Sequence, residues 1–545
     1  MSRLDSASPR SLRSAAALGL VAALAVGCTS ADADTTVAGR AAVGTSPLPT
    51  VPPAQPPAQL TRAEVDTAVG QLDDVVKDAM RTTGVPGIAV GVVYDDKVVY
   101  LKGFGLRKAG TKDRIGADTV FQLASVSKPL ASTAVAAAVG DKSLGWDDPV
   151  VKYTPGFALK DPWVSRHVTV ADLFAHRSGL PDHAGDLLED LGYDRSYILD
   201  HLRYEPLAPF RAHYAYTNFG LTEAGVAAAR AAGTTWEKLS ADKVYKPLGM
   251  DSTSSSFADY EKAGDKASLH VRSGDTWRAS YVRNPDAQSP AGGASSTVRD
   301  MTKWLRLQLG NGKFEGRQVV DAAALEQTHL PHMLSAPPHT PAGRAGFYGL
   351  GWNVSYDDEG RLKLGHSGGF ALGAATNVTL LPSEKLGIVV LTNGEPIGVP
   401  EAISATFLDT AQTGGPTVDW LKFLGPVFEQ TLQAERSETD YSKPPASPAP
   451  AKANSAYTGT YANDYYGPLT VSAQGDELSL QIGPKKQRFV LTHYDGDTFS
   501  YRTTGEMAVG LTGVTFTVGS GGRADKVRVE NLDTSGLGTF TRKEQ

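Results

Sequence analysis

The spacing of hydrophobic and polar residues changes along the chain, and each change marks a new element. After TRAE at residues 61–64, a capping-box sequence, apolar residues recur at helical spacing through residue 79. This pattern predicts an amphipathic helix. Residues 87–105 (GIAVGVVYDDKVVYLKGFG) contain two apolar runs on either side of Asp95 and Asp96, which predicts a β-hairpin. The first folded unit therefore begins with a helix and a hairpin.

The pattern then becomes mainly helical and returns to strands later. Residues 118–308 have helical periodicity interrupted by many loops. Residues 352–369 and 375–393 alternate as strands do, and the second of these segments is a predicted hairpin. One more helix is predicted over residues 420–433. Strands thus stand before and after a long helical section.

Two segments rich in proline and alanine separate these regions. Residues 29–60 end in TSPLPTVPPAQPPAQL, and residues 436–456 contain SKPPASPAPAKANSA. Neither composition can bury a core, so we expect a tether and a linker. Residues 457–545 follow as short alternating strands separated by turns, which predicts a small all-β domain. The main folded domain is expected at residues 61–435.

Composition excludes some classes of function. Of the 545 residues, 41% are hydrophobic and 21% are charged, as in ordinary globular proteins. The 53 basic and 59 acidic residues give a net charge of −6 without a basic run, which argues against a nucleic-acid-binding protein. There is no HExxH or CxxC motif, and the 11 histidines share no helical face. We therefore predict no metal site and no cofactor.

The single cysteine, Cys28, follows a segment typical of exported proteins. Arginines precede an apolar run at residues 15–27, which is too short to span a bilayer but suits a signal peptide. The small residues just before Cys28 resemble the lipobox of bacterial lipoproteins, in which the cysteine is acylated. We expect residues 1–28 to be a lipoprotein signal, with the protein anchored by lipid to the outer face of the cell membrane. Ordinary secretion after cleavage near this position is the alternative.

Residues 119–140 contain a pair of side chains suited to catalysis. In TVFQLASVSKPLASTAVAAAVG the only charged residue is Lys128, which follows Ser125 by three positions at the predicted start of a buried helix. An ammonium among apolar side chains loses hydration, so its pKa falls and a neutral amine can activate a serine. The alternative is a lysine whose stem lines the core while its charge reaches water.

Three motifs in order resemble those of one enzyme family. SVSK at residues 125–128 resembles the S-x-x-K motif of serine β-lactamases and penicillin-binding proteins. YTN at residues 216–218 resembles the Y-x-N motif of class C-type members, and HSG at residues 366–368 resembles the third motif in its H-x-G form. The resemblance spans about residues 60–410. It implies an α/β fold with an antiparallel sheet flanked by helices and a mostly helical subdomain, followed here by a small all-β accessory domain.

The resemblance also implies catalytic roles. Ser125 would attack a carbonyl and form an acyl-enzyme, and Lys128 and Tyr216 would share the proton transfers. Which of the two deprotonates Ser125 is left open at this point. A phenol with a pKa near 10 can act as a base only if a nearby cation lowers that pKa, and Lys128 is the expected cation.

Further matching residues would support substrate binding. Asn218 would hydrogen-bond the lysine and the substrate amide, and the backbone N–H of Gly369 would form an oxyanion hole with that of the nucleophile. Gly368 and Gly369 would let substrate approach the strand closely. His366 stands where relatives carry lysine, so we expect a weaker, pH-dependent positive field towards a substrate carboxylate. That substitution favours peptidase or esterase activity over strong β-lactam hydrolysis.

The stretch LGHSGGFALG also fits G-x-S-x-G, the nucleophile elbow of α/β-hydrolases, with Ser367 as nucleophile. That arrangement requires an acid and then a histidine downstream. The only histidine after His366 is His493, which lies in the predicted all-β domain. The elbow also requires a helix directly after the serine, whereas this region has the pattern strand, turn, strand. We therefore expect Ser367 to line the wall of a site rather than to attack substrate.

Other polar residues are expected to be structural. His176 is interpreted as closing a short helix, and Glu401 and Asp300 lack surroundings typical of a deacylating acid. The shape of the pocket is expected to come from loops at residues 181–210 and 331–345.

The sequence thus predicts an exported serine hydrolase that acts by acyl transfer on D-amino-acid peptides, amides or esters. Its expected partners are a small-molecule or peptide substrate, with a peptidoglycan stem peptide as one candidate, and a membrane reached only through the N-terminal lipid. Two alternatives stay open: a true β-lactamase, and a non-catalytic lipoprotein that binds cell-wall peptides. The intact set of Ser125, Lys128 and Tyr216 argues against the pure binder.

Overall fold

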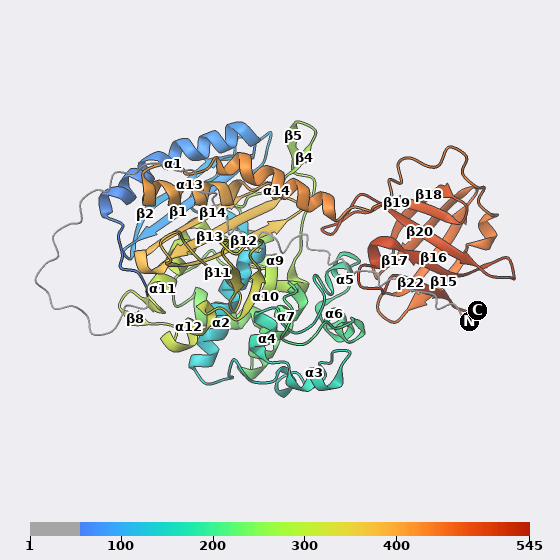
Figure 1. Ribbon diagram of the computed structural model, residues 1–545, viewed down its shortest axis with the longest axis horizontal. Helices are drawn as coiled ribbons and strands as arrows, with labels where there is room; N and C mark the ends of the chain where they lie inside the picture. Colours follow the sequence, from blue (N-terminus) through green and yellow to red (C-terminus); the bar gives the residue numbers. More distant parts are fainter. Residues whose placement is uncertain (1–54, 545) are drawn as a thin grey trace, which may run out of the picture.

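A computed structural model describes residues 55–544, which form a sheet-and-helix unit and a β-barrel (Figure 1). Cys28, the predicted signal peptide and most of the predicted tether lie outside the described residues. Among the described residues, no helix has both the length and the apolar character needed to cross a membrane.

The first unit is built on an eight-stranded antiparallel sheet with the order β2-β1-β14-β13-β12-β11-β10-β9. Its strands are β1 (Gly87–Tyr94), β2 (Lys97–Gly105), β9 (Met333–Ala336), β10 (Gly346–Tyr348), β11 (Asn353–Tyr356), β12 (Leu362–Phe370), β13 (Ala374–Leu381) and β14 (Leu386–Thr392). The two predicted hairpins are present, and β1 of the first pairs with β14 of the second. Asp95 and Asp96 turn the first hairpin with positive φ angles, as a two-residue turn requires.

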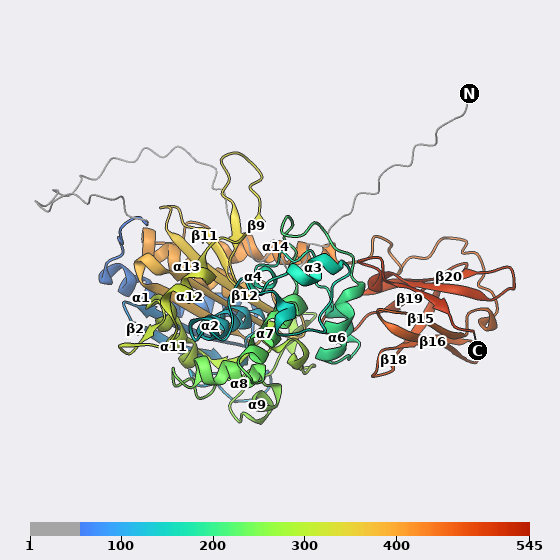
Figure 2. The same cartoon turned by 90° about the horizontal axis from the view of Figure 1, so that it is seen from below.

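Helices cover both faces of this sheet (Figure 1, Figure 2). One face carries α1 (Arg62–Thr83) and α13 (Val399–Thr413), with α14 (Trp420–Ala434) packed on α13; the other carries α2 (Ser127–Gly140) and α11 (Val298–Leu309). Because side chains alternate along a strand, Ile88 and Val90 of β1 face α1, whereas Ala89 faces the second core. The capping box predicted at the start of α1 is formed by Thr61 and Glu64.

The section predicted as helical forms a subdomain of short helices at one side of the sheet (Figure 2). These are α3 (Pro162–His167), α4 (Val170–Phe174), α5 (Asp186–Asp190), α6 (Arg195–His201), α7 (Asn218–Ala231), α8 (Trp236–Ser240), α9 (Phe257–Lys262) and α10 (Ser289–Gly292), with α12 (Ala322–His329) following α11. Three small two-stranded sheets were not predicted: β3 (Val120–Gln122) with β6 (Ser295–Thr297), β4 (Val271–Ser273) with β5 (Thr276–Arg278), and β7 (Lys313–Phe314) with β8 (Arg317–Gln318).

The described end of the predicted tether is bound to the sheet unit. The backbone N–H groups of Gln59 and Leu60 donate to the Glu384 carboxylate at 3.1 and 3.0 Å. The hydroxyl of Tyr94 donates to the Leu60 carbonyl at 2.9 Å. Glu384 is buried and ion-paired with Arg361 at 2.8 Å. A proline-rich segment cannot form a core of its own, but here its backbone satisfies a buried carboxylate.

The C-terminal unit is a closed barrel of eight consecutive antiparallel strands. They are β15 (Gly459–Asn463), β16 (Gly467–Gln474), β17 (Glu477–Ile482), β18 (Gln487–Asp495), β19 (Thr498–Arg502), β20 (Leu511–Val518), β21 (Ala524–Val529) and β22 (Thr539–Arg542). The sequence predicts an all-β domain but not its closure, because closure depends on pairing between the first and last strands. Closure leaves no exposed sheet edge.

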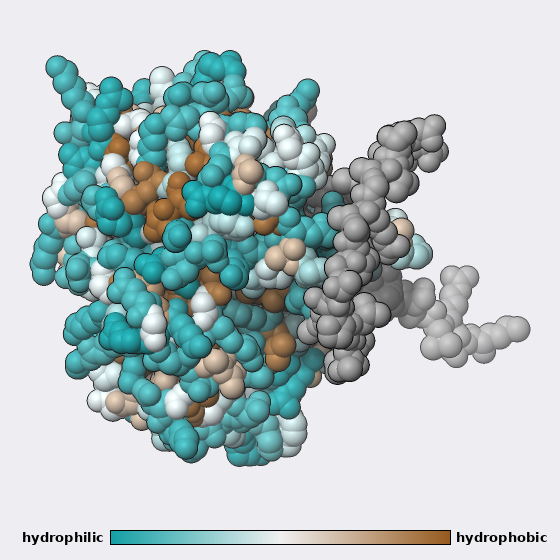
Figure 3. Space-filling view, turned by 90° about the vertical axis from the view of Figure 1, so that its left-hand side faces the viewer, coloured by the Kyte–Doolittle hydropathy of each residue, from teal (hydrophilic) through white to brown (hydrophobic). Residues whose placement is uncertain are grey.

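The barrel docks on α5 and α6 of the helical subdomain (Figure 1). The backbone N–H of Gly185 donates to the Tyr465 hydroxyl at 3.1 Å, and the Tyr193 hydroxyl donates to the Tyr466 carbonyl at 2.7 Å. The surface at the far end of the first unit, away from the barrel, is mostly hydrophilic, and its apolar residues gather mainly in one patch in the upper half of the view (Figure 3). Through its contacts with Gly185 and Tyr193, the barrel covers the side of the helical subdomain that leads to the site described next.

Candidate active site

Ser125 lies at a sharp turn between a strand and a helix. β3 leads into a 3₁₀ turn, η2 (Ala124–Val126), and α2 begins directly after it. Ala124 has a φ of +47°, a left-handed conformation that costs an L-residue about 1–2 kcal/mol and must be held by the surrounding packing. The predicted position of Ser125 just before a helix N-terminus is confirmed.

Lys128 is fully enclosed, with no exposed side-chain surface. Its Nζ donates to Ser125 Oγ at 3.1 Å, to Asn218 Oδ1 at 2.7 Å and to the Ala291 carbonyl at 3.0 Å. Burial lowers the pKa of Lys128 to about 7, an effect that the negative charge of Asp186 opposes. The alternative of a lysine whose charge reaches water is therefore wrong.

The three partners of Lys128 differ in one respect that matters for catalysis. The Asn218 oxygen and the Ala291 carbonyl can only accept hydrogen bonds, whereas the Ser125 hydroxyl can also donate. When the ammonium loses a proton, the two remaining N–H groups can stay with the two pure acceptors. The lone pair then points at Ser125 Oγ, which is the orientation that a general base requires.

Tyr216 is buried over the same lysine, with Nζ of Lys128 4.5 Å from the centre of its ring. Burial raises the pKa of Tyr216, the hydrogen bond with Ser125 opposes this shift, and Asp186 adds to it. The sequence-based expectation that Lys128 would lower the pKa of this phenol is therefore wrong, because loss of hydration is the larger effect. Tyr216 carries a proton at neutral pH.

Asn218 links the lysine to two residues that sequence reasoning did not identify. It begins α7, and while its Oδ1 accepts from Lys128, its Nδ2 donates to Asp186 Oδ2 at 2.8 Å. Nδ1 of His183 contacts the same carboxylate oxygen at 2.7 Å. Burial alone lowers the pKa of His183, but the hydrogen bond and charge of Asp186 raise it overall. A chain of polar contacts therefore runs from Lys128 to His183.

The backbone of the Tyr-Thr-Asn motif is fixed by two further side chains. The N–H of Tyr216 donates to Asp182 Oδ1 at 2.5 Å, and the N–H of Thr217 donates to His176 Nδ1 at 3.2 Å. His176 does follow a short helix, as predicted, but it also holds the motif in place. Since these contacts join residues far apart in sequence, no local pattern could have revealed them.

His366 lies on β12 as an uncharged residue. Its Nδ1 contacts the Ser367 carbonyl at 2.6 Å and its Nε2 contacts the Tyr348 hydroxyl at 2.9 Å. A carbonyl only accepts, so Nδ1 carries the hydrogen and Nε2 accepts from the tyrosine. Burial, together with the charge of Lys128, lowers the pKa of His366 to about 3. The expected positive field from this residue is therefore absent at physiological pH.

The end of β12 that carries the motif has a free edge. β11 pairs with β12 only as far as Gly365, whereas β13 pairs with it through Phe370. At Gly368 an added Cβ would lie 2.9 Å from the backbone nitrogen of Ser125, so only glycine lets the strand approach the nucleophile this closely. Ser367 sits within this strand with no helix after it, which confirms it as a wall residue.

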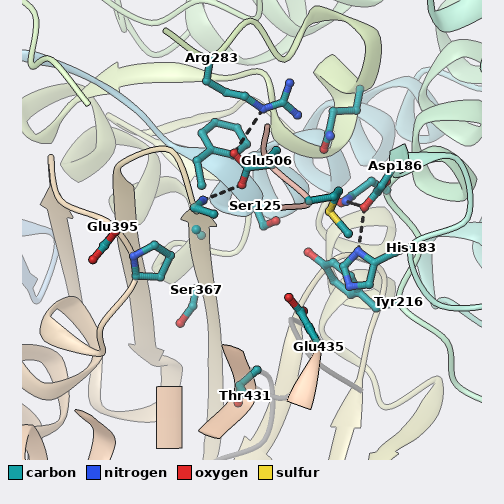
Figure 4. A pocket seen from close by; sticks show the side chains of 18 of the residues that line it. Ser125, His183, Asp186, Tyr216, Arg283, Ser367, Glu395, Thr431, Glu435 and Glu506 are labelled. Carbon is teal, nitrogen blue, oxygen red and sulfur yellow. Dashed lines mark hydrogen bonds and ion pairs between the residues drawn. The ribbon is translucent and has the colours of Figure 1, made fainter. Parts of the chain in front are cut away.

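These residues line a cavity of about 200 Å³ (Figure 4). Among the lining residues are Ser125, Tyr216, Asn218, His366, Gly368 and Gly369, so within residues 55–544 the predicted site residues other than Lys128 meet in one place. Lys128 lies behind Ser125. Figure 4 shows Arg283 and Glu506 on one side of Ser125 and Thr431 and Glu435 on the other.

The barrel contributes part of the cavity wall. Glu506, Met507 and Ala508, from the loop between β19 and β20, are lining residues. Glu506 Oε1 accepts from the N–H of Ala371 at 2.6 Å, directly after β12, and the N–H groups of Glu506 and Met507 donate to Asp190 at 3.1 and 2.7 Å. The small domain is therefore part of the site, which its own sequence did not indicate.

The structure corrects two further expectations. Glu401, set aside as a residue without catalytic surroundings, lines the cavity, whereas Asp300 binds Ser252, Thr253 and Lys303 away from it. The loop at residues 181–210 contributes His183, Asp186 and Glu189 to the cavity, as expected. The loop at residues 331–345 contributes nothing to it, because β9 within that segment joins the far edge of the sheet.

Across residues 55–544, no three histidine, cysteine or acidic side chains are grouped to hold a metal ion.

Comparison with known proteins agrees with this geometry. Residues 72–411 match the family model described as Beta-lactamase, and residues 443–540 match one described as a domain of unknown function (DUF3471). Unguisins hydrolase ungD' of Aspergillus campestris is 27% identical over 419 residues, covering 73% of this chain and 76% of that protein. D-alanyl-D-alanine-carboxypeptidase/endopeptidase AmpH of Escherichia coli K12 is 24% identical over 325 residues, covering 58% and 81%.

The fold is shared with solved structures. The octameric penicillin-binding protein homologue from Pyrococcus abyssi superimposes with a TM-score of 0.55 at 21% identity, covering 85% of this chain and 98% of that one. The family model covers most of the first unit, and the chain belongs to the beta-lactamase family. It is accordingly a serine hydrolase of the β-lactamase and penicillin-binding-protein superfamily, with the fold that the motifs implied.

Proposed function

We propose that this member of the beta-lactamase family hydrolyses D-amino-acid peptides, amides or esters through an acyl-enzyme on Ser125. One observation carries the proposal: Nζ of Lys128 lies 3.1 Å from Ser125 Oγ in a fully enclosed position. With its pKa lowered to about 7, the lysine is available as a neutral amine near neutral pH. A protein that only bound its ligand would gain nothing from this lysine, because burying a lysine so completely is costly.

Acylation begins when the Lys128 amine takes the hydroxyl proton of Ser125 while Oγ bonds to the substrate carbonyl carbon. The backbone N–H groups of Ser125 and Gly369 donate hydrogen bonds to the carbonyl oxygen and stabilise the negative charge that forms on it. The bond from that carbon to the leaving nitrogen or oxygen then breaks. Tyr216 gives its proton to the leaving atom and regains one from the Lys128 ammonium beneath its ring.

Deacylation repeats these transfers with water. Lys128, neutral again, takes a proton from water as the water oxygen bonds to the acyl carbon, and the bond to Ser125 Oγ breaks as Oγ takes the proton back. In this scheme Tyr216 passes protons without a lasting charge, which fits the raised pKa of its phenol. The sequence left open which of the two residues deprotonates Ser125. In this scheme Lys128 is the base and Tyr216 is the proton donor.

The substrate class is supported by the relatives. One relative is named a D-alanyl-D-alanine-carboxypeptidase/endopeptidase and another a hydrolase of unguisins. Strong β-lactam hydrolysis is disfavoured because neutral His366 offers no positive charge to a substrate carboxylate. A peptidoglycan stem peptide is one candidate substrate.

A fluorescent fluorophosphonate tests this function. Wild-type protein should become covalently labelled, Ser125→Ala should not, and the matched control Ser367→Ala should keep its label. A panel of p-nitrophenyl esters, D-Ala-D-Ala peptides and D-amino-acid amides should then show turnover that Ser125→Ala loses. Equal labelling of wild type and Ser125→Ala, or no labelling and no turnover by the wild type, would disprove the proposal.

We also propose export and lipid attachment at Cys28. Support comes from the apolar run at residues 15–27 and the small residues before the cysteine. Cells expressing the full chain should incorporate radioactive palmitate into this protein, and Cys28→Ser should abolish incorporation. Release of a shortened, unlabelled wild-type protein into the medium would instead indicate ordinary secretion.

A further inference from the structure

The two ends of the cavity carry different electrostatic environments. At one end Arg283 is ion-paired with Glu189 at 2.6 Å and lies 3.7 Å from Glu506. Among the described residues that line the cavity, Arg283 is the only arginine or lysine. Ser367 and Glu435 lie on the other side of Ser125 from Arg283 (Figure 4). Glu401, which is hydrogen-bonded to Ser367, and His366, which precedes Ser367 on β12, also line the cavity, and we call these four residues the His366 end. It therefore combines two carboxyl groups with a neutral imidazole.

Glu401 is the least satisfied of these groups. It projects from α13, and its side chain is buried, with 7% of the residue exposed. Burial raises the pKa of Glu401 to about 7, against the opposing effect of a hydrogen bond from the Ser367 hydroxyl, so the side chain is a carboxylate above that pH. The same hydroxyl accepts from Asn377 Nδ2 at 3.1 Å. The second carboxylate oxygen, Oε2, has no hydrogen-bond partner. Because an unpaired buried acceptor is costly, a ligand that brings a donor to Oε2 would be favoured.

No neighbouring cation compensates Glu401 on the cavity side. His183, whose pKa is raised, already contacts Asp186 at 2.7 Å. Glu401 also borders a second cavity, in which Lys363 faces Asp357, Asp358 and Asp409. The charge of Lys363 is thus directed at three other carboxylates. The charge of Lys128 acts on His366, but its Nζ is already hydrogen-bonded to three acceptors. A negatively charged ligand at the His366 end would therefore meet Glu401 and Glu435 without a cation of its own to pair with.

The His366 end is where the leaving group lies in the proposed reaction. Tyr216 protonates the leaving atom, and its ring centre lies 6.4 Å from that of His366. The N–H of Gly369 and the loop of the barrel lie towards the opposite end, where Glu506 meets the chain just after β12. The acyl part of a substrate therefore extends towards the barrel, and the part released after acylation extends towards Glu401.

We propose that Glu401 is a specificity-determining residue that binds an N–H donor on the leaving group and rejects a leaving group bearing a carboxylate. The inference rests on the proposed function and narrows it. Substrates with a carboxamide, an ammonium or a continuing peptide chain in the leaving group are accepted. Substrates that release a free amino acid with its carboxylate, as carboxypeptidase substrates do, are disfavoured.

A matched pair of substrates tests this inference. Acetyl-D-Ala-D-Ala-amide and acetyl-D-Ala-D-Ala differ only in the last group, carboxamide or carboxylate. At a pH at least one unit above the Glu401 pKa of about 7, where the side chain is ionised, we expect the wild type to prefer the amide by about 10- to 100-fold in kcat/KM. This is the scale of one unpaired like-charge contact in a buried site. Glu401→Gln keeps the size of the side chain and removes its charge, and should reduce that ratio to within about threefold of one. Glu401→Lys should reverse it.

The matched control is Glu261→Gln, which removes an exposed carboxylate on α9 and should leave the ratio unchanged. If either peptide is cleaved too slowly to measure, the same ratio is obtained from inhibition of p-nitrophenyl ester hydrolysis. A wild-type ratio near one, a preference for the free acid, or a ratio that Glu401→Gln leaves unchanged would overturn the inference. The absence of peptide binding to both wild type and variant would do so too. Any of these results with intact ester hydrolysis at Ser125 leaves the proposed function standing, whereas loss of both disproves it.

Discussion

The two walls of the cavity treat charge in opposite ways. The helical wall, formed by Ser125, Lys128, Tyr216 and Asn218, gives every proton of the buried lysine an acceptor. The strand wall, formed by β12 and α13, presents a neutral His366 and a carboxylate oxygen of Glu401 without a partner. A satisfied network is suited to moving protons in a fixed geometry, and an unsatisfied one is suited to selecting what binds. Reaction and selectivity are therefore assigned to different walls.

The largest expected effect comes from breaking the helical wall. Lys128→Met removes the base while keeping an unbranched chain of similar length, and kcat/KM for p-nitrophenyl acetate should fall by about 10²- to 10⁴-fold. His366→Asn on the strand wall should change the same constant by less than about tenfold, because His366 transfers no proton in the proposed reaction. Steady-state kinetics of both purified variants checks the comparison. Similar losses in the two variants would contradict the division between the walls.

A smaller effect should separate the base from the proton donor. Tyr216→Phe removes only the phenol, so hydrolysis of a D-amino-acid amide, whose leaving nitrogen needs a proton, should fall by about 10²-fold. Hydrolysis of a p-nitrophenyl ester should fall much less, because p-nitrophenolate leaves without a proton. The ratio of the two losses is the measurement. An equal loss on both substrates would make Tyr216 the base instead.

The motifs and the broad fold could be predicted from the sequence because both leave local patterns in it. SVSK places Ser125 and Lys128 one helical turn apart, so local geometry alone brings them together. The strand and helix periodicity likewise fixed the main hairpins and α1, since burial on one face leaves a regular pattern. The pairing of the first strand with the last in each unit has no such local signal.

The electrostatics of the site could not be predicted in the same way. The charge of His366 and the pKa of Tyr216 depend on how completely each group is buried, which arises from contacts with distant segments. Glu401 enters the cavity only because α13 packs against β13 and β14. Met507 arrives from another domain. Loops and contacts between the two units leave no periodic pattern in the sequence, so the sequence did not predict them.

A substitution in the barrel, which belongs to neither wall, should have an effect of intermediate size. Met507 lines the cavity from the loop between β19 and β20, at the end to which we assign the acyl part of a substrate. Met507→Ala should enlarge this end and change KM for p-nitrophenyl esters by roughly threefold to tenfold in favour of longer acyl chains, with kcat for the acetyl ester little altered. A series of acetyl, butyryl and hexanoyl esters measures the shift. Unchanged chain-length preference would place the loop outside the acyl site.

The smallest effect is a shift in pH dependence. The negative charge of Asp186 raises the pKa of Lys128 against the effect of burial. Asp186→Asn removes that charge, so the pKa of Lys128 should fall and the rise of kcat/KM with pH should move to lower pH, by up to about one unit. The reason for the sign is that only the neutral amine acts as base. A pH–rate profile of wild type and variant decides it, and a shift to higher pH would contradict the assignment.

The central claim is that the buried amine of Lys128 becomes neutral near pH 7 and activates Ser125. The most direct measurement is the second-order rate of inactivation by an uncharged fluorophosphonate between pH 5 and pH 10. The predicted rate rises through a single apparent pKa of about 7 and is level above pH 8, and it falls to a low, pH-independent value in Lys128→Met. A rate that keeps rising to pH 10, or a wild-type profile retained by Lys128→Met, would contradict the account.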